Sequence, residues 1–113
     1  MELNYSETDR GVRVIRLKGN LDSAGVSQIE TGFAGHCAGD NARVMVDVAE
    51  VEFLASIGIR LLLLNAKSVS SRGGKMVLLA PTPEVEEVLE LTGILPVIPA
   101  YASTESAETA LLA

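Results

Sequence analysis

The N-terminal residues alternate between polar and apolar side chains in two runs, a pattern that predicts a β-hairpin. Residues 2–8 form the first run, and residues 12–17 form the second after the turn signal Asp9-Arg10-Gly11. Residues 42–48 differ because they are rich in β-branched side chains. They predict a buried central strand, and the acidic and apolar residues 49–55 after it are expected to form a loop.

Between these strands, apolar side chains recur at helical spacing. Asp22 or Ser23 can cap the helix, which is expected to end near Gly39. The apolar face of this amphipathic helix consists of Val26, Ile29, Phe33 and Cys37.

The second half of the chain continues to alternate between predicted helices and strands. The predicted elements are a helix over 57–70, a strand over 76–80, a helix over 84–91 introduced by Pro83, an edge strand at 97–98 and a final helix over 104–111. The whole order predicts an α/β fold with a mixed sheet of four to five strands and about four helices packed mainly on one side.

The composition is that of one acidic domain spanning residues 1–113. Hydrophobic residues make up 48% of the chain, which is too many for a disordered protein. The net charge of −6 opposes a phosphate backbone, and an aromatic content of 4% offers few rings for stacking on bases. The longest apolar stretch, residues 53–66, is too interrupted to span a membrane. We therefore expect no nucleic-acid partner, no membrane insertion and, without an apparent signal peptide, a cytoplasmic location.

The sequence offers no complete set of catalytic residues. His36 and Cys37 are the only residues of their types, so no disulfide within the chain and no zinc site built from Cys and His can form. Neighbours on a helix point about 100° apart, which favours a surface histidine beside a core cysteine. A phosphocarrier would need a reactive side chain at the start of a helix, whereas His36 lies near the end of one. We expect no enzymatic activity of its own and no cofactor.

Ser56 lies where the predicted loop meets the predicted helix over 57–70. Serine is a preferred N-cap residue, so a plain capping role is one interpretation. At about 100° per residue, Ile57, Leu61 and Leu64 form an apolar strip on the side of the helix away from the expected core. Two interpretations of this strip are open. Either the third or fourth helix covers it, or the strip is a docking surface beside an exposed serine. The side expected to face the sheet holds Gly58, Ile59, Leu62, Ala66 and Val69.

A phosphoryl group on Ser56 would suit the start of a helix. The free amides and the dipole at a helix N-terminus accommodate its ~1.5 to 2 negative charges, so the fold would tolerate it. Within an apolar docking strip, and close to Glu50 and Glu52, the same charge would weaken a partner's binding. Such a switch would act on the partner rather than on the fold.

A longer motif runs from the central strand into the following helix. It consists of Val46-Asp47-Val48, Val51, Phe53-Leu54, Ser56, Gly58-Ile59 and Lys67, and Gly19-Asn20-Leu21-Asp22 precedes the first helix. These residues resemble the STAS family, the domains of sulfate transporters and anti-sigma factor antagonists. The likeness is greatest to the single-domain bacterial antagonists and covers nearly the whole chain.

The resemblance implies regulation by partner switching. In this family the unmodified antagonist binds an anti-sigma factor that is also a serine kinase of the ATP-binding type, and so frees a sigma factor for transcription. The kinase phosphorylates the antagonist and ends the complex, and a serine phosphatase resets it. By motif position, Ser56 is the implied phosphoacceptor. The motif and the apolar strip together give the expected partner surface as Asp22, Ser23, Phe53, Leu54, Ala55, Ser56, Ile57, Gly58, Arg60, Leu61 and Leu64.

Two positions depart from the family pattern and leave an alternative open. Ala55 stands where the family commonly has Asp, and Ile57 stands where Ser, Thr or Ala is common. These departures favour a STAS scaffold that works without phosphorylation, or a regulatory subunit associated with a transporter.

Overall fold

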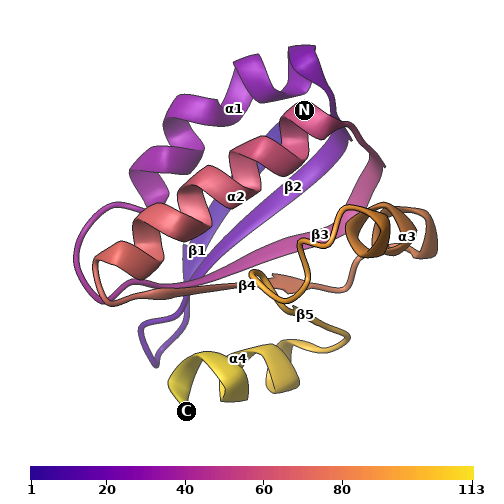
Figure 1. Ribbon diagram of the computed structural model, residues 1–113. Helices are drawn as coiled ribbons and strands as arrows, with labels where there is room; N and C mark the ends of the chain where they lie inside the picture. Colours follow the sequence, from indigo (N-terminus) through magenta and orange to yellow (C-terminus); the bar gives the residue numbers. More distant parts are fainter.

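Five strands form one mixed sheet in the order β1-β2-β3-β4-β5 in the computed structural model, which describes residues 1–113 (Figure 1). β1 pairs with β2 antiparallel, and all other neighbours are parallel. The strands are β1 (Glu2–Glu7), β2 (Arg13–Leu21), β3 (Arg43–Leu54), β4 (Lys75–Leu79) and β5 (Ala100–Tyr101). The predicted hairpin and the predicted mixed sheet are confirmed.

Helices cover both faces of the sheet unequally. Side chains alternate along β3, so Val44 and Val46 belong to a large core under α1, α2 and α3, whereas Met45 belongs to a small core with α4. In Figure 1, α1 and α2 lie side by side over one face and α4 lies beneath the other. The helices are α1 (Ser23–His36), α2 (Ser56–Ser71), α3 (Pro83–Leu91) and α4 (Thr104–Leu112). The expectation of helices mainly on one side is confirmed.

β3 is longer than the sequence pattern predicted. Residues 49–54 continue the strand, so the expected loop over 49–55 is wrong. The reason is pairing: β2 runs on to Leu21, and after register shifts its last residues still pair with Val51, Phe53 and Leu54. Two irregular steps in the ladder obscure the alternation that a sequence pattern relies on.

The predicted edge strand at 97–98 is also wrong. Ile98 lies in a turn instead, and its amide donates to the carbonyl oxygen of Ile94 at 2.9 Å. Pairing begins only after Pro99, whose own carbonyl accepts from the amide of Leu78 at 2.8 Å. Prolines at 96 and 99 flank the pair of apolar residues and leave no room for a strand there, so β5 forms at Ala100–Tyr101 instead.

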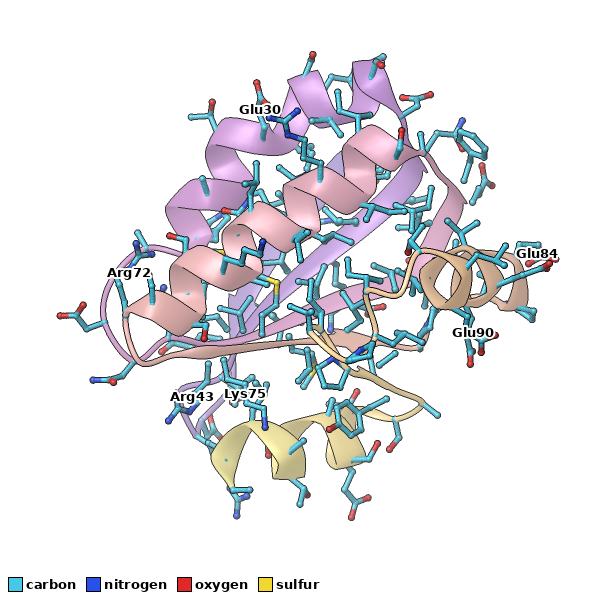
Figure 2. The ribbon with its side chains drawn as sticks, in the orientation of Figure 1. Glu30, Arg43, Arg72, Lys75, Glu84 and Glu90 are labelled. Carbon is cyan, nitrogen blue, oxygen red and sulfur yellow. The ribbon has the colours of Figure 1, made fainter.

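Cations gather at the amino-terminal edge of the parallel strands. Arg13, Arg43 and Lys75 are the first residues of β2, β3 and β4, and Figure 2 shows Arg43 and Lys75 near α4. Arg13 donates to the carbonyl oxygen of His36 at 3.0 Å, and Arg72 donates to that of Cys37 at 3.1 Å. These carbonyls end α1, where positive charge is favourable. The site described next lies at the opposite edge.

Candidate functional site

The carboxyl ends of β2 and β3 bring the starts of α1 and α2 together. Leu21 pairs with Leu54, the last residue of β3. Beyond that pair, the amide of Ala55 donates to the carbonyl oxygen of Leu21 at 3.1 Å. α1 begins two residues after Leu21, at Ser23, and α2 begins at Ser56. Both helices therefore begin at the same edge of the sheet. This edge brings together the two parts of the sequence motif, the segment that ends at Asp22 and the segment around Ser56.

Ser56 is the first residue of α2 and not its N-cap, so a capping role is wrong. The N-cap is Ala55, whose extended backbone (φ −90°, ψ 167°) lets its carbonyl oxygen accept from Gly58 at 2.9 Å and Ile59 at 3.1 Å. The exposed Ser56 hydroxyl makes no hydrogen bond within the protein, and the amides of Ser56 and Ile57 have no acceptor there. The start of α2 thus presents a free hydroxyl beside two free amides.

Asp22 caps α1, as one of the two sequence alternatives predicted. Its carboxylate accepts from the amide of Gly25 at 2.8 Å, and this occupies one of its oxygens. Ser23 is exposed as the first residue of α1. Asp22 therefore orients the first turn of α1 beside the first turn of α2, and its half-buried carboxylate is part of the edge that holds Ser56.

Two glycines permit this close approach of helices and strands. A Cβ on Gly58 would lie 2.7 Å from both the carbonyl oxygen and Cγ of Leu21. A Cβ on Gly25 would lie only 2.1 Å from the carbonyl oxygen of Asn20. Real Cβ atoms do not come this close to backbone atoms, so both positions require glycine. The Gly58 of the sequence motif thus has a structural purpose: it seats α2 on the end of β2.

The expected partner surface divides by exposure. Three apolar side chains stand out into solvent: Phe53 is exposed by 55%, Ile57 by 39% and Leu64 by 56%. Ser23, Ser56 and Arg60 are exposed as well, and Asp22 and Ala55 are half-buried. The remaining members are buried, namely Leu54, Gly58 and Leu61. These three residues form the buried base of the site and contribute little exposed surface.

The burial of Leu61 corrects the prediction of a continuous apolar strip. Leu61 is 8% exposed and belongs to the large core, although Ile57 and Leu64 on either side of it are exposed. Neither the third nor the fourth helix covers it. α1 packs against α2 instead, because both helices start at the same edge. The opposite side of α2 is as predicted: Gly58, Leu62, Ala66 and Val69 are buried, and Ile59 packs partly buried against the same core.

A shallow hollow of about 330 Å³ lies where α1 meets α2. Ile57, Leu61 and Leu64 line it from α2, and Arg60 stands at its edge. α1 contributes Val26 and Glu30, which sequence reasoning did not include in the surface; Figure 2 shows Glu30 projecting from α1. Glu30 follows Val26 by one helical turn, so a search for exposed residues one turn from a core position would have found it.

The other side of the site is acidic. A small hollow between β3 and α3 is lined by Glu52 and Phe53 from β3 and by Glu84 and Val88 from α3. Glu50 is exposed too and forms an ion pair with Lys18, with 3.9 Å between Nζ and Oε2. An exposed aromatic ring rimmed by carboxylates suits a partner that offers an apolar pocket with basic residues around it.

His36 and Cys37 are separated as the helical geometry predicted, with one difference. Cys37 is buried at the end of α1, and burial raises the pKa of its thiol to about 11. His36 is half-buried rather than fully exposed, because its ring stacks on Tyr5 with 4.0 Å between the centroids. No three His, Cys, Asp or Glu side chains are grouped so that they could hold a metal ion. None of the helices has the length and apolar character needed to traverse a membrane.

Comparison with known proteins agrees with this architecture. The model of the STAS domain matches residues 6–107, and the chain belongs to this family. BtrV of Bordetella bronchiseptica, by its name a candidate anti-sigma factor antagonist, is 33% identical over 110 residues, which are 97% of this chain and 94% of BtrV.

Solved structures show the same fold. An anti-sigma-factor antagonist (STAS) domain protein from Planctomyces limnophilus is 27% identical, with 98% of both chains covered and a TM-score of 0.87. The Bacillus cell fate determinant SpoIIAA in its phosphorylated form is 23% identical, with 96% of this chain and 99% of SpoIIAA covered and a TM-score of 0.70. At that identity SpoIIAA shows the fold alone. The relatives are thus anti-sigma factor antagonists built on the sheet and helices described above.

Proposed function

We propose that this protein is an anti-sigma factor antagonist that acts by partner switching, with Ser56 as the phosphoacceptor. The observation that carries the proposal is the free, exposed hydroxyl of Ser56 beside two free amides at the start of α2. A kinase needs an accessible hydroxyl, and this one has no hydrogen bond to lose. The names of BtrV and of the Planctomyces protein support the function class.

Unmodified Ser56 lies within a surface suited to binding. Phe53, Ile57 and Leu64 are exposed around it, and aromatic and aliphatic anchors of this kind dominate binding energy when a partner covers them. The first turn of α1 adds Asp22 and Ser23 at the same edge. The partner we propose is an anti-sigma factor that is also a serine kinase of the ATP-binding type, and a serine phosphatase restores the unmodified state.

A phosphoryl group on Ser56 changes the surface more than the fold. At the first helical position its oxygens accept from the free amides of Ser56 and Ile57, and the helix dipole favours its negative charge. Toward the partner it replaces a small hydroxyl by a hydrated dianion between Phe53 and Ile57. Covering that charge without a cation costs several kcal/mol, and each 1.4 kcal/mol is a factor of about ten in Kd. The modified protein therefore leaves the complex still folded.

This function asks for no catalytic machinery in the chain. The kinase and the phosphatase carry out the chemistry, and the antagonist is their substrate and ligand. Because sigma factors act where transcription takes place, the same function locates the protein in the cytoplasm.

The test is incubation with the cognate anti-sigma kinase and ATP, followed by intact mass. We expect the wild type to gain one phosphoryl group and Ser56→Ala to gain none. Ser70→Ala is the matched control, because Ser70 is an exposed serine of the same helix that lies outside the proposed partner surface, and it should be modified like the wild type. A wild-type protein that binds the kinase without gaining mass would overturn the phospho-switch.

That last result would favour a second function, a STAS scaffold or a transporter-associated regulatory subunit that works without phosphorylation. Ala55 and Ile57 support it: Ala55 offers no carboxylate before the serine, and Ile57 places a bulky, 39% exposed side chain directly after it. Both features weaken the recognition of Ser56 by a kinase. Capture of a STAS-bearing or transporter partner that tolerates Ser56→Asp would identify this alternative.

A further inference from the structure

The sheet edge beside Ser56 continues into a groove between β3 and α3, which pack against each other (Figure 1). Two hollows form this β3–α3 groove, one of about 570 Å³ and one of about 70 Å³. Glu52 from β3 and Glu84 from α3 line both hollows, so the two are continuous. The groove reaches the surface around Ser56 through Phe53 and Leu54, which line the smaller hollow.

The smaller hollow is apolar at its base. Leu54 and Val85 are buried members of the large core, and Val88 packs half-buried against that core. Phe53 lines the same hollow and is 55% exposed. Exposed apolar side chains beside a hollow mark interaction sites, and an aromatic ring contributes a large area when a partner covers it. This part of the groove therefore suits an apolar side chain of a partner.

Carboxylates dominate the charge of the groove. Its lining holds three exposed glutamates, Glu50, Glu52 and Glu84, and one cation, Lys18. Lys18 pairs with Glu50, whereas Glu52 and Glu84 make no ion pair. The helix dipole accounts for Glu84 in the first turn of α3, but Glu50 and Glu52 lie on a strand, where the net dipole is small. The groove therefore attracts positive charge.

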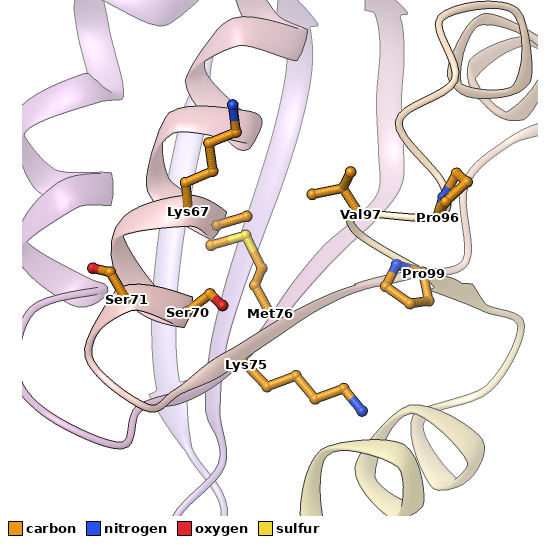
Figure 3. A pocket seen from close by; sticks show the side chains of 9 residues that line it. Lys67, Ser70, Ser71, Lys75, Met76, Pro96, Val97 and Pro99 are labelled. Carbon is orange, nitrogen blue, oxygen red and sulfur yellow. The ribbon is translucent and has the colours of Figure 1, made fainter.

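The cavity at the far end of α2 lacks these features. Figure 3 shows that its two lysines, Lys67 and Lys75, point apart. Lys75 extends toward α4 and donates to the carbonyl oxygen of Ala110 at 3.1 Å. No carboxylate side chain lines this cavity. Positive charge on a partner is thus favoured at the β3–α3 groove and opposed at the other end of α2.

We propose that the β3–α3 groove binds a basic segment of the anti-sigma factor, in which an apolar side chain is flanked by Lys or Arg. The apolar side chain covers Phe53 and Val88, and the basic side chains lie against Glu52 and Glu84. This inference rests on the proposed function and extends its partner surface from the start of α2 to α3. Complementary charge at such a rim acts mainly on the rate of association and on the choice of partner.

The experiment measures binding of the full chain to the cognate anti-sigma kinase by surface plasmon resonance, without ATP so that Ser56 stays unmodified. Glu52→Gln combined with Glu84→Gln should slow association about fivefold at about 50 mM NaCl, and the difference should nearly vanish at about 500 mM, where salt screens the charges. Val88→Thr keeps the size of the side chain but adds a hydroxyl to the covered surface, so it should speed dissociation about threefold.

The matched control is Glu86→Gln combined with Glu105→Gln. It removes the same amount of charge, and it also takes one carboxylate from the first turn of α3. Glu86 lines a different hollow, however, and Glu105 lies on α4. The control should associate as fast as the wild type, and far-UV circular dichroism verifies the fold of each variant.

Two results would overturn the groove and leave the proposed function standing: a Glu52 and Glu84 variant that associates as fast as the control, or a Val88→Thr protein that dissociates like the wild type. A wild-type chain that does not bind the kinase at all would overturn the proposed function together with the groove. Gain of a phosphoryl group on Ser56 reports on the proposed switch separately.

Discussion

The amide of Ala55 and the carbonyl oxygen of Leu21 are 3.1 Å apart, and this hydrogen bond fixes the residue before Ser56 to the end of β2. Gly58 faces the same carbonyl one turn later, where a Cβ would lie 2.7 Å from it. The position of Ser56 therefore depends on two contacts with Leu21, one made by a hydrogen bond and one permitted by the lack of a side chain.

Gly58→Ala should destabilise the protein by about 1–3 kcal/mol, since the added methyl group overpacks against backbone. Urea unfolding measures this change. Gly32→Ala is the control: Gly32 lies within α1 with open space around its Cβ position, so alanine there should stabilise by about 0.5–1 kcal/mol. Equal effects of the two substitutions would contradict the close approach of α2 to Leu21.

Most elements of the fold could be predicted because their apolar patterns are local. The hairpin, α1 with Asp22 as one of two candidate caps, and α2 follow from spacing within one segment. The extension of β3 to Leu54 could not be predicted, because it depends on pairing with the end of β2 across two register shifts. Likewise β5 begins after Pro99 because Leu78 bonds to the Pro99 carbonyl, a contact between distant segments.

The site shows the same division. The motif located Ser56, and the helical wheel correctly placed Ile57 and Leu64 on the surface. It failed for Leu61, because a wheel gives directions around one helix and not the neighbour that lies there. The packing of α1 against α2 decides that Leu61 is buried and brings Val26 and Glu30 into the surface.

Asp22→Ala should cost about 1 kcal/mol of stability, because the amide of Gly25 loses its acceptor at the start of α1. Thermal unfolding at neutral pH measures the loss. Asp22→Asn is the control, since asparagine caps about as well as aspartate. If Asn is as damaging as Ala, the carboxylate charge rather than the cap holds this turn.

Leu61 and Leu64 should respond differently to truncation although they are one turn apart. Leu61→Ala leaves a cavity in the large core and should destabilise by about 2–5 kcal/mol. Leu64 is 56% exposed, so Leu64→Ala should change stability by less than about 0.5 kcal/mol. In binding assays with the anti-sigma factor, Leu64→Ala should weaken the complex while the protein stays folded. A fully stable Leu61→Ala protein would contradict the packing of α1 against α2.

Cys37 should make the protein less stable in alkali. The folded protein keeps the thiol proton up to a pKa of about 11, whereas the unfolded chain releases it near 9.0. Between these values the unfolded state binds fewer protons, so the free energy of unfolding falls as pH rises, by about 2–3 kcal/mol in total. Below pH 9 the folded and unfolded states both keep the thiol proton, so none of this stability is lost. The measurement is the pH slope of stability relative to Cys37→Ala, which lacks the thiol, and parallel slopes would disprove the contribution.

Ser56→Asp should have opposite effects on the fold and on the complex. A carboxylate at the first position of α2 faces free amides and the positive end of the dipole, so the isolated domain should gain about 0.3–1 kcal/mol. The same charge between Phe53 and Ile57 should weaken binding of the anti-sigma factor at least tenfold. Ser70→Asp is the matched control at the other end of the helix, where the dipole disfavours negative charge: it should lose a similar amount of stability and keep full binding. A Ser56→Asp protein that binds normally would show that the partner does not cover the start of α2.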